Sequence, residues 1–161
     1  MIEVGYATAE DNEPARLLLK ATAERLVERL EPLWPPHEFT PDWVEAKRTG
    51  GQLVVGKRGG ELVGVSLLQY EDEDFWPDRA QGQALYMHRI CAAPGLERGR
   101  WPKALFDWAE GEARRLGRPY LRLDCFPRPK LRAVYEGQGF EKVDDRWVHF
   151  LYVYRYQRAV R

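Results

Sequence analysis

The segment from Ala84 to Phe140 constrains the fold more than any other, because strand, helix and strand signals follow one another within it. Apolar residues predict a strand at 84–92, and a second strand is predicted at 120–126. Between them, a loop rich in glycine and arginine leads into an amphipathic helix that is closed by Gly117. The predicted buried stripe of this helix is Trp101, Leu105, Trp108, Ala109 and Leu116. This order predicts a β-α-β crossover in the middle of the chain.

A strand and a capped helix are predicted at the N-terminus. The short strand covers residues 2–6, and Thr8 and Asp11 are both candidate caps of the helix that follows. Pro14 favours Asp11, because the proline then lies in the first turn, where its missing N–H does no harm. We expect the helix to reach about residue 30, with an apolar stripe at Ala15, Leu18, Leu19, Leu26 and Leu30.

A second helix and a hairpin are predicted next. Thr40-Pro41-Asp42 places a capping residue, a proline and an acid in the order that starts a helix, and the glycine pair 50–51 ends it. Strands are predicted at 52–57 and 62–70, joined by a turn whose glycines tolerate positive φ. The acidic loop 71–74 is expected to be exposed.

A short helix containing Tyr135 and a last apolar strand at 147–156 complete the predicted elements. No repeat, low-complexity tract or long linker divides the sequence, so we expect one domain over residues 1–161. The predicted fold class is mixed α/β. About four helices flank a central, twisted, mostly antiparallel sheet of six to seven strands with one β-α-β crossover.

Composition excludes several classes of protein. Lysine plus arginine and aspartate plus glutamate both number 25, and this balance argues against a non-specific nucleic-acid binder. No apolar run approaches the roughly 18 residues of a membrane-spanning helix, and the N-terminus lacks the features of a signal peptide. We therefore expect a soluble cytoplasmic protein with no nucleic-acid or membrane partner. Cys91 and Cys125 lie in apolar runs and are expected to be buried, reduced thiols.

A Tyr-Glu-x-x-Gly-Phe motif occupies residues 135–140, in the helix after the 120–126 strand. Together with the order of elements from Ala84 onward, this motif resembles the GCN5-related N-acetyltransferase (GNAT) family, and the similarity extends over essentially the whole chain. The resemblance implies an acyltransferase that uses acetyl-CoA as co-substrate. It implies that an amine of a small molecule or peptide attacks the thioester directly in a ternary complex.

The loop from Gly95 to Pro102 opens a helix, where backbone N–H groups and the helix dipole favour an anion such as the pyrophosphate of CoA. The family reads Arg/Gln-x-x-Gly-x-Gly/Ala here, and this chain has Glu97, Arg100 and Pro102 at the three defined positions. The carboxylate repels phosphate, the arginine adds bulk and the proline removes a donor. These losses of phosphate binding could be partly compensated by the positive charges of Arg98, Arg100 and Lys103 and by the flexibility of Gly99.

Other cofactor contacts follow from the resemblance. The backbone of Ile90 and Ala92 is expected to pair with the pantetheine arm as a neighbouring strand would. Arg128 replaces a common asparagine of the family, and its basic cluster either meets the 3′-phosphate or is simply solvated. The expected cofactor-binding residues are Ile90, Ala92, Arg98, Gly99, Arg100, Trp101, Lys103, Ala104, Arg128 and Arg132.

Catalysis requires an acid and a base. The resemblance gives Tyr135 the role of protonating the departing thiolate, and a phenol with a pKa near 10 suits that role. His88, which shares a face with Tyr86 and Ile90 by two-residue alternation, is one candidate base. Glu71 and Asp72, just after the third strand, could instead attract the cationic amine or relay its proton through water, and a water linked to Glu71 is the other candidate base. Ordinary packing would also explain the tyrosine and the histidine. The sequence shows no metal-binding motif and no serine-nucleophile motif.

Other interpretations stay open. The altered loop could belong to a catalytically impaired GNAT-like module that binds a ligand or partner. The six tryptophans and the last strand could supply a homodimer surface, although core packing explains them equally well. The strand residues concerned are Phe150, Leu151, Tyr152, Val153 and Tyr154. Loops at 31–39, with Trp34 and His37, and at 71–79 could form the acceptor site, but the sequence does not identify the amine.

Overall fold

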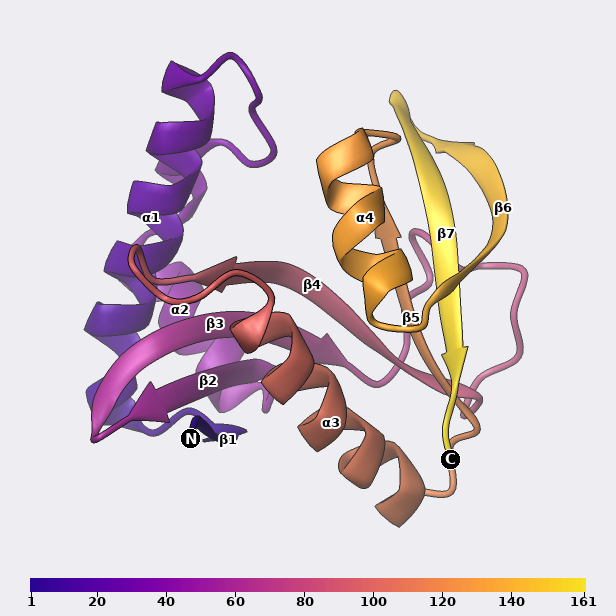
Figure 1. Cartoon of the computed structure of the whole chain (residues 1–161), viewed down its shortest axis with the longest axis horizontal. Coiled ribbons are helices and arrows are strands. Elements are labelled where there is room, and N and C mark those ends of the chain that lie inside the picture. Colours follow the sequence, from indigo (N-terminus) through magenta and orange to yellow (C-terminus); the bar gives the residue numbers. More distant parts are fainter. The chain divides into compact units, whose positions relative to one another are not determined.

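The structure, a computed structural model, describes all 161 residues and contains seven strands and four α-helices (Figure 1). The strands are β1 (Glu3–Tyr6), β2 (Leu53–Arg58), β3 (Glu61–Gln69), β4 (Ala84–Ala92), β5 (Tyr120–Cys125), β6 (Glu141–Val148) and β7 (Leu151–Ala159). The helices are α1 (Asn12–Glu28), α2 (Pro41–Thr49), α3 (Arg100–Arg115) and α4 (Pro129–Gly137), with short 3-10 helices η1 (Ala9–Asp11) and η2 (Pro36–Glu38). No helix is both long enough and apolar enough to cross a membrane.

One sheet contains the strands in the order β1-β2-β3-β4-β5-β7-β6. β4 and β5 pair in parallel, as the predicted crossover requires. The β1–β2, β2–β3, β5–β7 and β6–β7 pairs are antiparallel. The predicted fold class is therefore confirmed. The residues pack as two compact units, unit 1 (Met1–Leu68 and Arg89–Ala104) and unit 2 (Gln69–His88 and Leu105–Arg161).

Helices α1 and α2 cover one face of the β2–β3 hairpin in unit 1. Their buried side chains meet alternate residues of the two strands, and the cluster comprises Ala15, Leu19, Ala23, Phe39, Val44, Leu53, Val55, Val65, Leu67 and Cys91. Burial at every fourth residue of α1 agrees with the predicted apolar stripe. Leu30 was placed on that stripe wrongly, because it lies beyond the helix and is 89% exposed.

The predicted cap of α2 is confirmed, whereas Asp11 precedes α1 but its side chain makes no capping hydrogen bond to that helix. Thr40 Oγ1 accepts a hydrogen bond from the Trp43 N–H at 3.1 Å at the start of α2. Thr8 and Asp11 instead form a capping box around η1, in which Asp11 Oδ2 accepts the Thr8 N–H at 2.8 Å. After α1, Leu30 adopts a φ of +57°, a conformation that usually belongs to glycine at this position.

Trp101, the second residue of α3, covers the other face of the β2–β3 hairpin. Gly56 and Gly64 pair with each other across these strands, one residue from the pair Val55 and Val65 that faces α1 and α2. A Cβ atom on either glycine would lie within 2.3 Å of the Trp101 ring. The indole is completely buried, and its Nε1–H donates to the Val65 carbonyl at 3.2 Å. The two glycines therefore form the platform that positions the start of α3.

In unit 2, α4 covers one face of β5 and β7 (Figure 1). Tyr135 of α4 lies between Phe106 of α3 and Tyr156 of β7, with ring centroids 6.4 Å away on each side. Phe140 follows α4 and packs on Phe106 at 4.7 Å. Gly139 has a φ of +83°, which ends the helix as predicted and turns the chain toward this aromatic core.

The buried stripe of α3 is only partly as predicted. Leu105 and Ala109 are completely buried. Leu116 is 39% exposed, because α3 has ended and Gly117 turns the chain with a φ of +70°. Ala113 takes its place as the last buried residue of the helix.

The prediction of one last strand over residues 147–156 is wrong. Residues 141–159 form a hairpin of two strands, β6 and β7, with a turn at His149 (φ +55°) and at Phe150, which is 97% exposed. β6 lies at the edge of the sheet and is mostly charged and exposed, as edge strands commonly are. It therefore lacks the apolar alternation by which a strand is recognised in sequence.

Both cysteines are buried, as predicted. Burial raises the pKa of the Cys91 thiol to about 12, and it does the same for Cys125. Neither is a thiolate at neutral pH, so neither is a nucleophile.

Candidate active site

β4 carries His88, and the residue after it has an unusual backbone conformation. Arg89 has a φ of +52°, which is unusual for a residue other than glycine. Its guanidinium is 3.0 Å from Glu38 Oε1 and lies 5.7 Å from the centroid of the Trp34 ring. A residue in this conformation breaks two-residue alternation, as a β-bulge does. The prediction that Ile90 shares the face of His88 therefore loses its basis.

His88 lies between two carboxylates in unit 2. Its Nε2 atom is 2.8 Å from Asp72 Oδ2, and its Nδ1 atom is 3.7 Å from Asp124 Oδ1. The side chains of His88, Asp72 and Asp124 are 13%, 4% and 11% exposed. The first distance is that of a hydrogen bond and the second is too long for one. The two ring nitrogens thus have different surroundings.

Asp72 corrects the expectation of an exposed acidic loop, because its side chain is buried. Its Oδ1 atom accepts the Phe75 N–H at 3.0 Å. Burial by itself raises the pKa of this carboxyl. The hydrogen bond and charge of His88, with the backbone N–H groups of Phe75 and Asp74, outweigh burial and hold the pKa below its ordinary value. Asp72 is therefore an anion at neutral pH.

Glu71, the other residue considered for moving the proton of the amine, faces different atoms. Its Oε1 is 3.2 Å from Arg118 Nη1 and accepts the Gly82 N–H at 2.8 Å. Arg118 also donates to two backbone carbonyls of unit 2. Glu71 thus ties together the ends of the loop between β3 and β4, and the carboxylate beside His88 belongs to Asp72.

Asp72, His88 and Asp124 also offer atoms within 4.8 Å of one another from which a metal ion could be bound. However, the two carboxylates approach different ring nitrogens, whereas an imidazole binds an ion through one of them. The 2.8 Å contact is already a direct hydrogen bond. This arrangement suits the transfer of a proton better than the binding of a metal ion.

Tyr135 is partly buried in the same unit. Burial raises the pKa of its phenol well above the usual value, and the neighbouring Cys125 thiol and Asp124 carboxylate raise it further. The phenol therefore carries its proton throughout the physiological pH range and can donate it. Asp124 thus lies near both predicted catalytic side chains. Its carboxylate is 3.7 Å from His88 Nδ1, and its negative charge raises the pKa of Tyr135.

The predicted pyrophosphate loop belongs to unit 1 and leads into α3, as expected. Gly95 and Gly99 have φ angles of +86° and +80°, which other residues rarely adopt. The Arg100 N–H donates to the Glu97 carbonyl at 3.1 Å, so the first helical turn closes here. Three basic side chains in the loop and the first turn of α3 are exposed, those of Arg98, Arg100 and Lys103.

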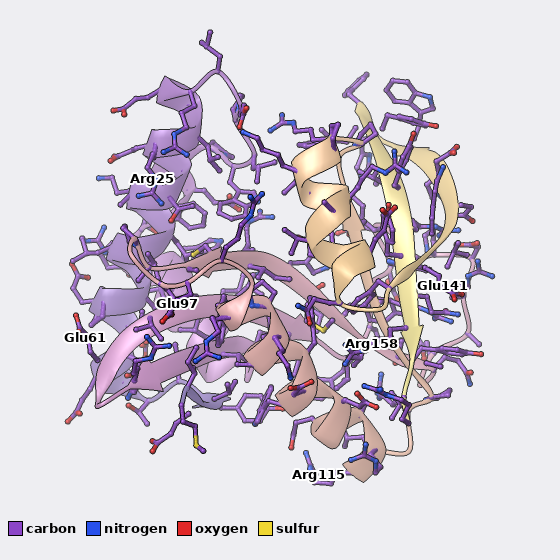
Figure 2. All side chains as sticks on the ribbon, in the orientation of Figure 1. Arg25, Glu61, Glu97, Arg115, Glu141 and Arg158 are labelled. Carbon is purple, nitrogen blue, oxygen red and sulfur yellow. The ribbon has the colours of Figure 1, made fainter.

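Glu97 puts a negative charge on this loop, at the position that Figure 2 labels. Its carboxylate lies 3.2 Å from Arg58 at the end of β2. The backbone N–H of Glu97 itself, and then Arg58, hold the pKa of the carboxyl below its ordinary value. An anion of the protein thus already interacts with an N–H group and a cation beside the start of α3.

Several expected cofactor residues have their side chains engaged. The Trp101 side chain is completely buried, which leaves only its backbone for a ligand. In unit 2, Arg132 Nε donates to the Tyr156 hydroxyl at 3.2 Å, and the Arg128 guanidinium lies 5.2 Å from the centroid of the Phe126 ring. Partly exposed residues among those expected are Ile90, Ala92, Gly99 and Ala104.

Two residues considered for the acceptor site lie around η2 in unit 1. Trp34 packs edge-on against Phe39, with ring centroids 6.1 Å apart, whereas His37 is exposed. Trp34 is thus partly explained by packing of the loop.

Two functional candidates, Asp124 and Arg58, were not predicted from the sequence, and Asp72 was predicted only together with Glu71. Asp124 is an acid at the buried end of β5, and such a residue needs a partner, which is a signal that sequence can give. Asp72 belongs to an acidic run, and the sequence does not show that it, rather than Glu71, lies beside His88. Arg58 meets Glu97 across 39 positions of sequence, so only the fold reveals the pair.

Solved structures with this fold are numerous, and each shares little sequence with the chain. A GNAT-family acetyltransferase from Listeria monocytogenes is 23% identical, with 98% of this chain and 94% of that one covered and a TM-score of 0.78. The structure of yncA from Salmonella typhimurium with its cofactor acetyl-CoA is 15% identical, covers 100% and 95%, and has a TM-score of 0.70. Ribosomal-protein-alanine N-acetyltransferase from Brucella melitensis is 17% identical, covers 98% and 99%, and has a TM-score of 0.68.

Identity at this level shows the fold alone, and a search of curated proteins finds no match. The family comparison is decisive: the acetyltransferase (GNAT) family matches residues 19–140 of the 161-residue chain. That match includes β4, the loop into α3, β5 and the motif at Tyr135. The chain belongs to the GNAT acetyltransferase family.

Proposed function

We propose that this protein is an acetyl-CoA-dependent N-acetyltransferase, formed by residues 1–161 as one domain, that acetylates an amine of a small molecule or peptide. The observation that carries the proposal is the set of ionisable groups in unit 2. There His88 contacts an ionised carboxylate, and the Tyr135 phenol carries a proton at neutral pH. They are a base and an acid of the kinds that transfer from a thioester to an amine needs.

His88 would remove one proton from the ammonium group of the acceptor, which frees the nitrogen lone pair for attack on the thioester carbonyl. Collapse of the tetrahedral intermediate breaks the carbon–sulfur bond, and Tyr135 protonates the departing thiolate. The second proton of the amine restores the phenol. The net reaction forms an amide and CoA and releases one proton, with direct transfer and no acyl-enzyme. Burial of both cysteines agrees with the absence of such an intermediate.

The loop before α3 would bind the pyrophosphate through backbone N–H groups at the helix N-terminus. Arg98, Arg100 and Lys103 are exposed there and would supply positive charge. Ile90 and Ala92 would offer backbone groups to the pantetheine arm. Acetyl-CoA is the cofactor in the yncA complex, and this supports the same donor here.

One observation favours a second candidate function, a catalytically impaired module that binds a ligand or partner. Glu97, Arg100 and Pro102 stand where the family has a basic or amide side chain and two small residues, and the Glu97 carboxylate already interacts with Arg58 and an N–H of the loop. If CoA cannot displace that carboxylate, the fold would persist without cofactor binding.

Calorimetric titration with acetyl-CoA and with desulfo-CoA separates the two candidates. A dissociation constant of about 1–100 µM supports the enzyme. Absence of binding by the native protein, with binding restored in the double variant Arg100→Gly/Pro102→Gly, supports the impaired module.

Tyr135→Phe tests catalysis once binding is established. We expect kcat with a panel of amines to fall by about 10²-fold or more while the Kd for acetyl-CoA stays unchanged. Tyr152→Phe, on β7 and outside this group, is the matched control and should retain native kcat. Equal kcat values for the native protein and Tyr135→Phe would remove Tyr135 from the mechanism.

A further inference from the structure

Asp72 is anchored so that its two oxygens have separate partners. Oδ1 accepts the Phe75 N–H at 3.0 Å, and the Asp72 carbonyl accepts the Trp76 N–H at 3.0 Å, which fixes the turn after β3. Oδ2 is then directed at His88 Nε2, 2.8 Å away. The side chain is 4% exposed, so water competes little for this contact.

The charge on Asp72 decides which atom carries the shared proton. Its lowered pKa makes it an anion at neutral pH, and a carboxylate only accepts hydrogen bonds. His88 must therefore donate from Nε2. A neutral imidazole has one N–H, so Nδ1 is left with a lone pair.

Asp124 agrees with this assignment. Its Oδ1 is 3.7 Å from His88 Nδ1, as expected when a carboxylate faces a lone pair rather than an N–H donor. Once Nδ1 gains a proton, the same carboxylate stabilises the positive ring. Two carboxylates that face the imidazole are those of Asp72, from the loop after β3, and Asp124, from β5, and the Phe75 ring lies 5.9 Å away.

We infer that Asp72 is a positioning residue that fixes the His88 ring with Nε2–H directed at its carboxylate and so makes Nδ1 the atom that accepts the proton of the amine. The tautomer follows from the structure alone, whereas its catalytic use rests on the proposed function. Neither aspartate belongs to the Tyr-Glu-x-x-Gly-Phe motif. In the proposed role, each acts through His88 and does not touch the reacting atoms.

Asp72→Asn is the decisive variant, because it keeps the shape of the side chain and reverses the direction of its hydrogen bond with His88 Nε2. The amide oxygen can still accept the Phe75 N–H, while the amide N–H₂ donates to Nε2 and forces the proton onto Nδ1. We expect nitrogen-15 NMR of labelled histidine to show the Nε2–H tautomer in the native protein and the Nδ1–H tautomer in the variant. His88→Gln identifies the signal among the three histidines. Asp74→Asn, two residues away and exposed, is the charge-matched control and should leave the tautomer unchanged.

The kinetic arm uses the same variants with an amine that the native protein acetylates. We expect Asp72→Asn to lower kcat by about 10²–10⁴-fold with an unchanged Kd for acetyl-CoA, and to cause no further loss in a His88→Gln background. A native Nδ1–H tautomer, or equal losses in both backgrounds, would overturn the inference. If no amine is acetylated, the proposed function fails, and the NMR result still decides the role of Asp72 toward His88.

Discussion

Trp101 lies so close to Gly64 that a Cβ atom at position 64 would be 2.2 Å from the indole ring. Gly64 pairs with Gly56 on the neighbouring strand, where a Cβ atom would be 2.3 Å from the same ring. The ring also donates to the Val65 carbonyl, so it cannot move away without losing that hydrogen bond. The start of α3, and with it the predicted pyrophosphate loop, therefore depends on two strand glycines far away in sequence.

Replacing Gly64 with alanine should destabilise the protein. We expect Gly64→Ala to lower the free energy of unfolding by about 1–3 kcal/mol, because the buried indole has no free space into which to shift. Denaturant titration followed by tryptophan fluorescence measures it. Gly5→Ala, on β1 with nothing within 4 Å of the added Cβ, is the control and should change stability little. Equal losses of stability in the two variants would contradict the conclusion that Gly56 and Gly64 position Trp101 and the start of α3.

Most helices and strands before β6 could be predicted from the sequence, because their signals are local. The Thr40 cap, the glycines of the β2–β3 turn and the end of α3 at Gly117 all act within a few residues, and each is found as predicted. β6 could not be predicted in the same way, because its exposed, charged residues carry no apolar period.

The candidate site was predictable only in part, for a similar reason. His88 and Tyr135 are found from strand position and motif. Asp72 and Asp124 gain their significance only when the turn after β3 and the end of β5 come to the same imidazole. Contacts of this kind between distant segments have no local pattern, and burial of Asp72 within an acidic run contradicts the usual rule that such runs are solvated.

Arg155 links two carboxylates in unit 2 and should make stability depend on acid pH. Its side chain is 2% exposed and lies 2.6 Å from Asp78 and 2.7 Å from Asp144. The hydrogen bond from Arg155 holds the pKa of Asp78 well below its ordinary value and also lowers the pKa of Asp144. A carboxyl whose pKa is lowered by folding stabilises the native state above the unfolded pKa of about 4, and this stabilisation is lost as the pH falls below it.

We therefore expect Asp78→Asn to cost about 1 kcal/mol at neutral pH, a small value because Asp78 is half exposed. We also expect the variant to lose less stability than the native protein between about pH 4 and pH 2. Urea titrations at several pH values give both quantities. Asp74→Asn removes an exposed acid of the same loop and should keep the native pH dependence. A native slope in Asp78→Asn would show that the Arg155 pairs do not control acid unfolding.

Leu30 offers a stabilising substitution. Its φ is +57° and it is 89% exposed, so the strained backbone is not offset by packing. The Leu30 N–H donates to Val27 O and the Glu31 N–H to Leu26 O, the pattern of a helix end that favours glycine. We expect Leu30→Gly to raise the unfolding free energy by about 0.5–1 kcal/mol. The control is Leu17→Gly, inside α1 and 51% exposed, which should lower the unfolding free energy by about 1 kcal/mol. If both substitutions lower the unfolding free energy, the backbone at Leu30 is not strained.

Glu97 should weaken cofactor binding, and its removal provides a test that depends on the proposed function. The carboxylate interacts with Arg58 and with its own backbone N–H, both of which can bind phosphate. We expect Glu97→Gln to tighten acetyl-CoA binding by about two- to fivefold, and Arg58→Met to weaken it by a similar factor. Calorimetry at low salt should show the largest difference, because mobile ions screen exposed charges.

The control for Glu97 is Glu61→Gln, which removes an exposed acid at the start of β3 in the same unit (Figure 2). It changes the net charge of the protein by the same amount, so any general electrostatic effect on the anionic cofactor appears in both variants. A larger gain in affinity for Glu97→Gln isolates the effect of the carboxylate on the loop. Equal gains would mean that net charge alone sets the affinity, and that the Arg58 pair leaves the anion site open to the pyrophosphate.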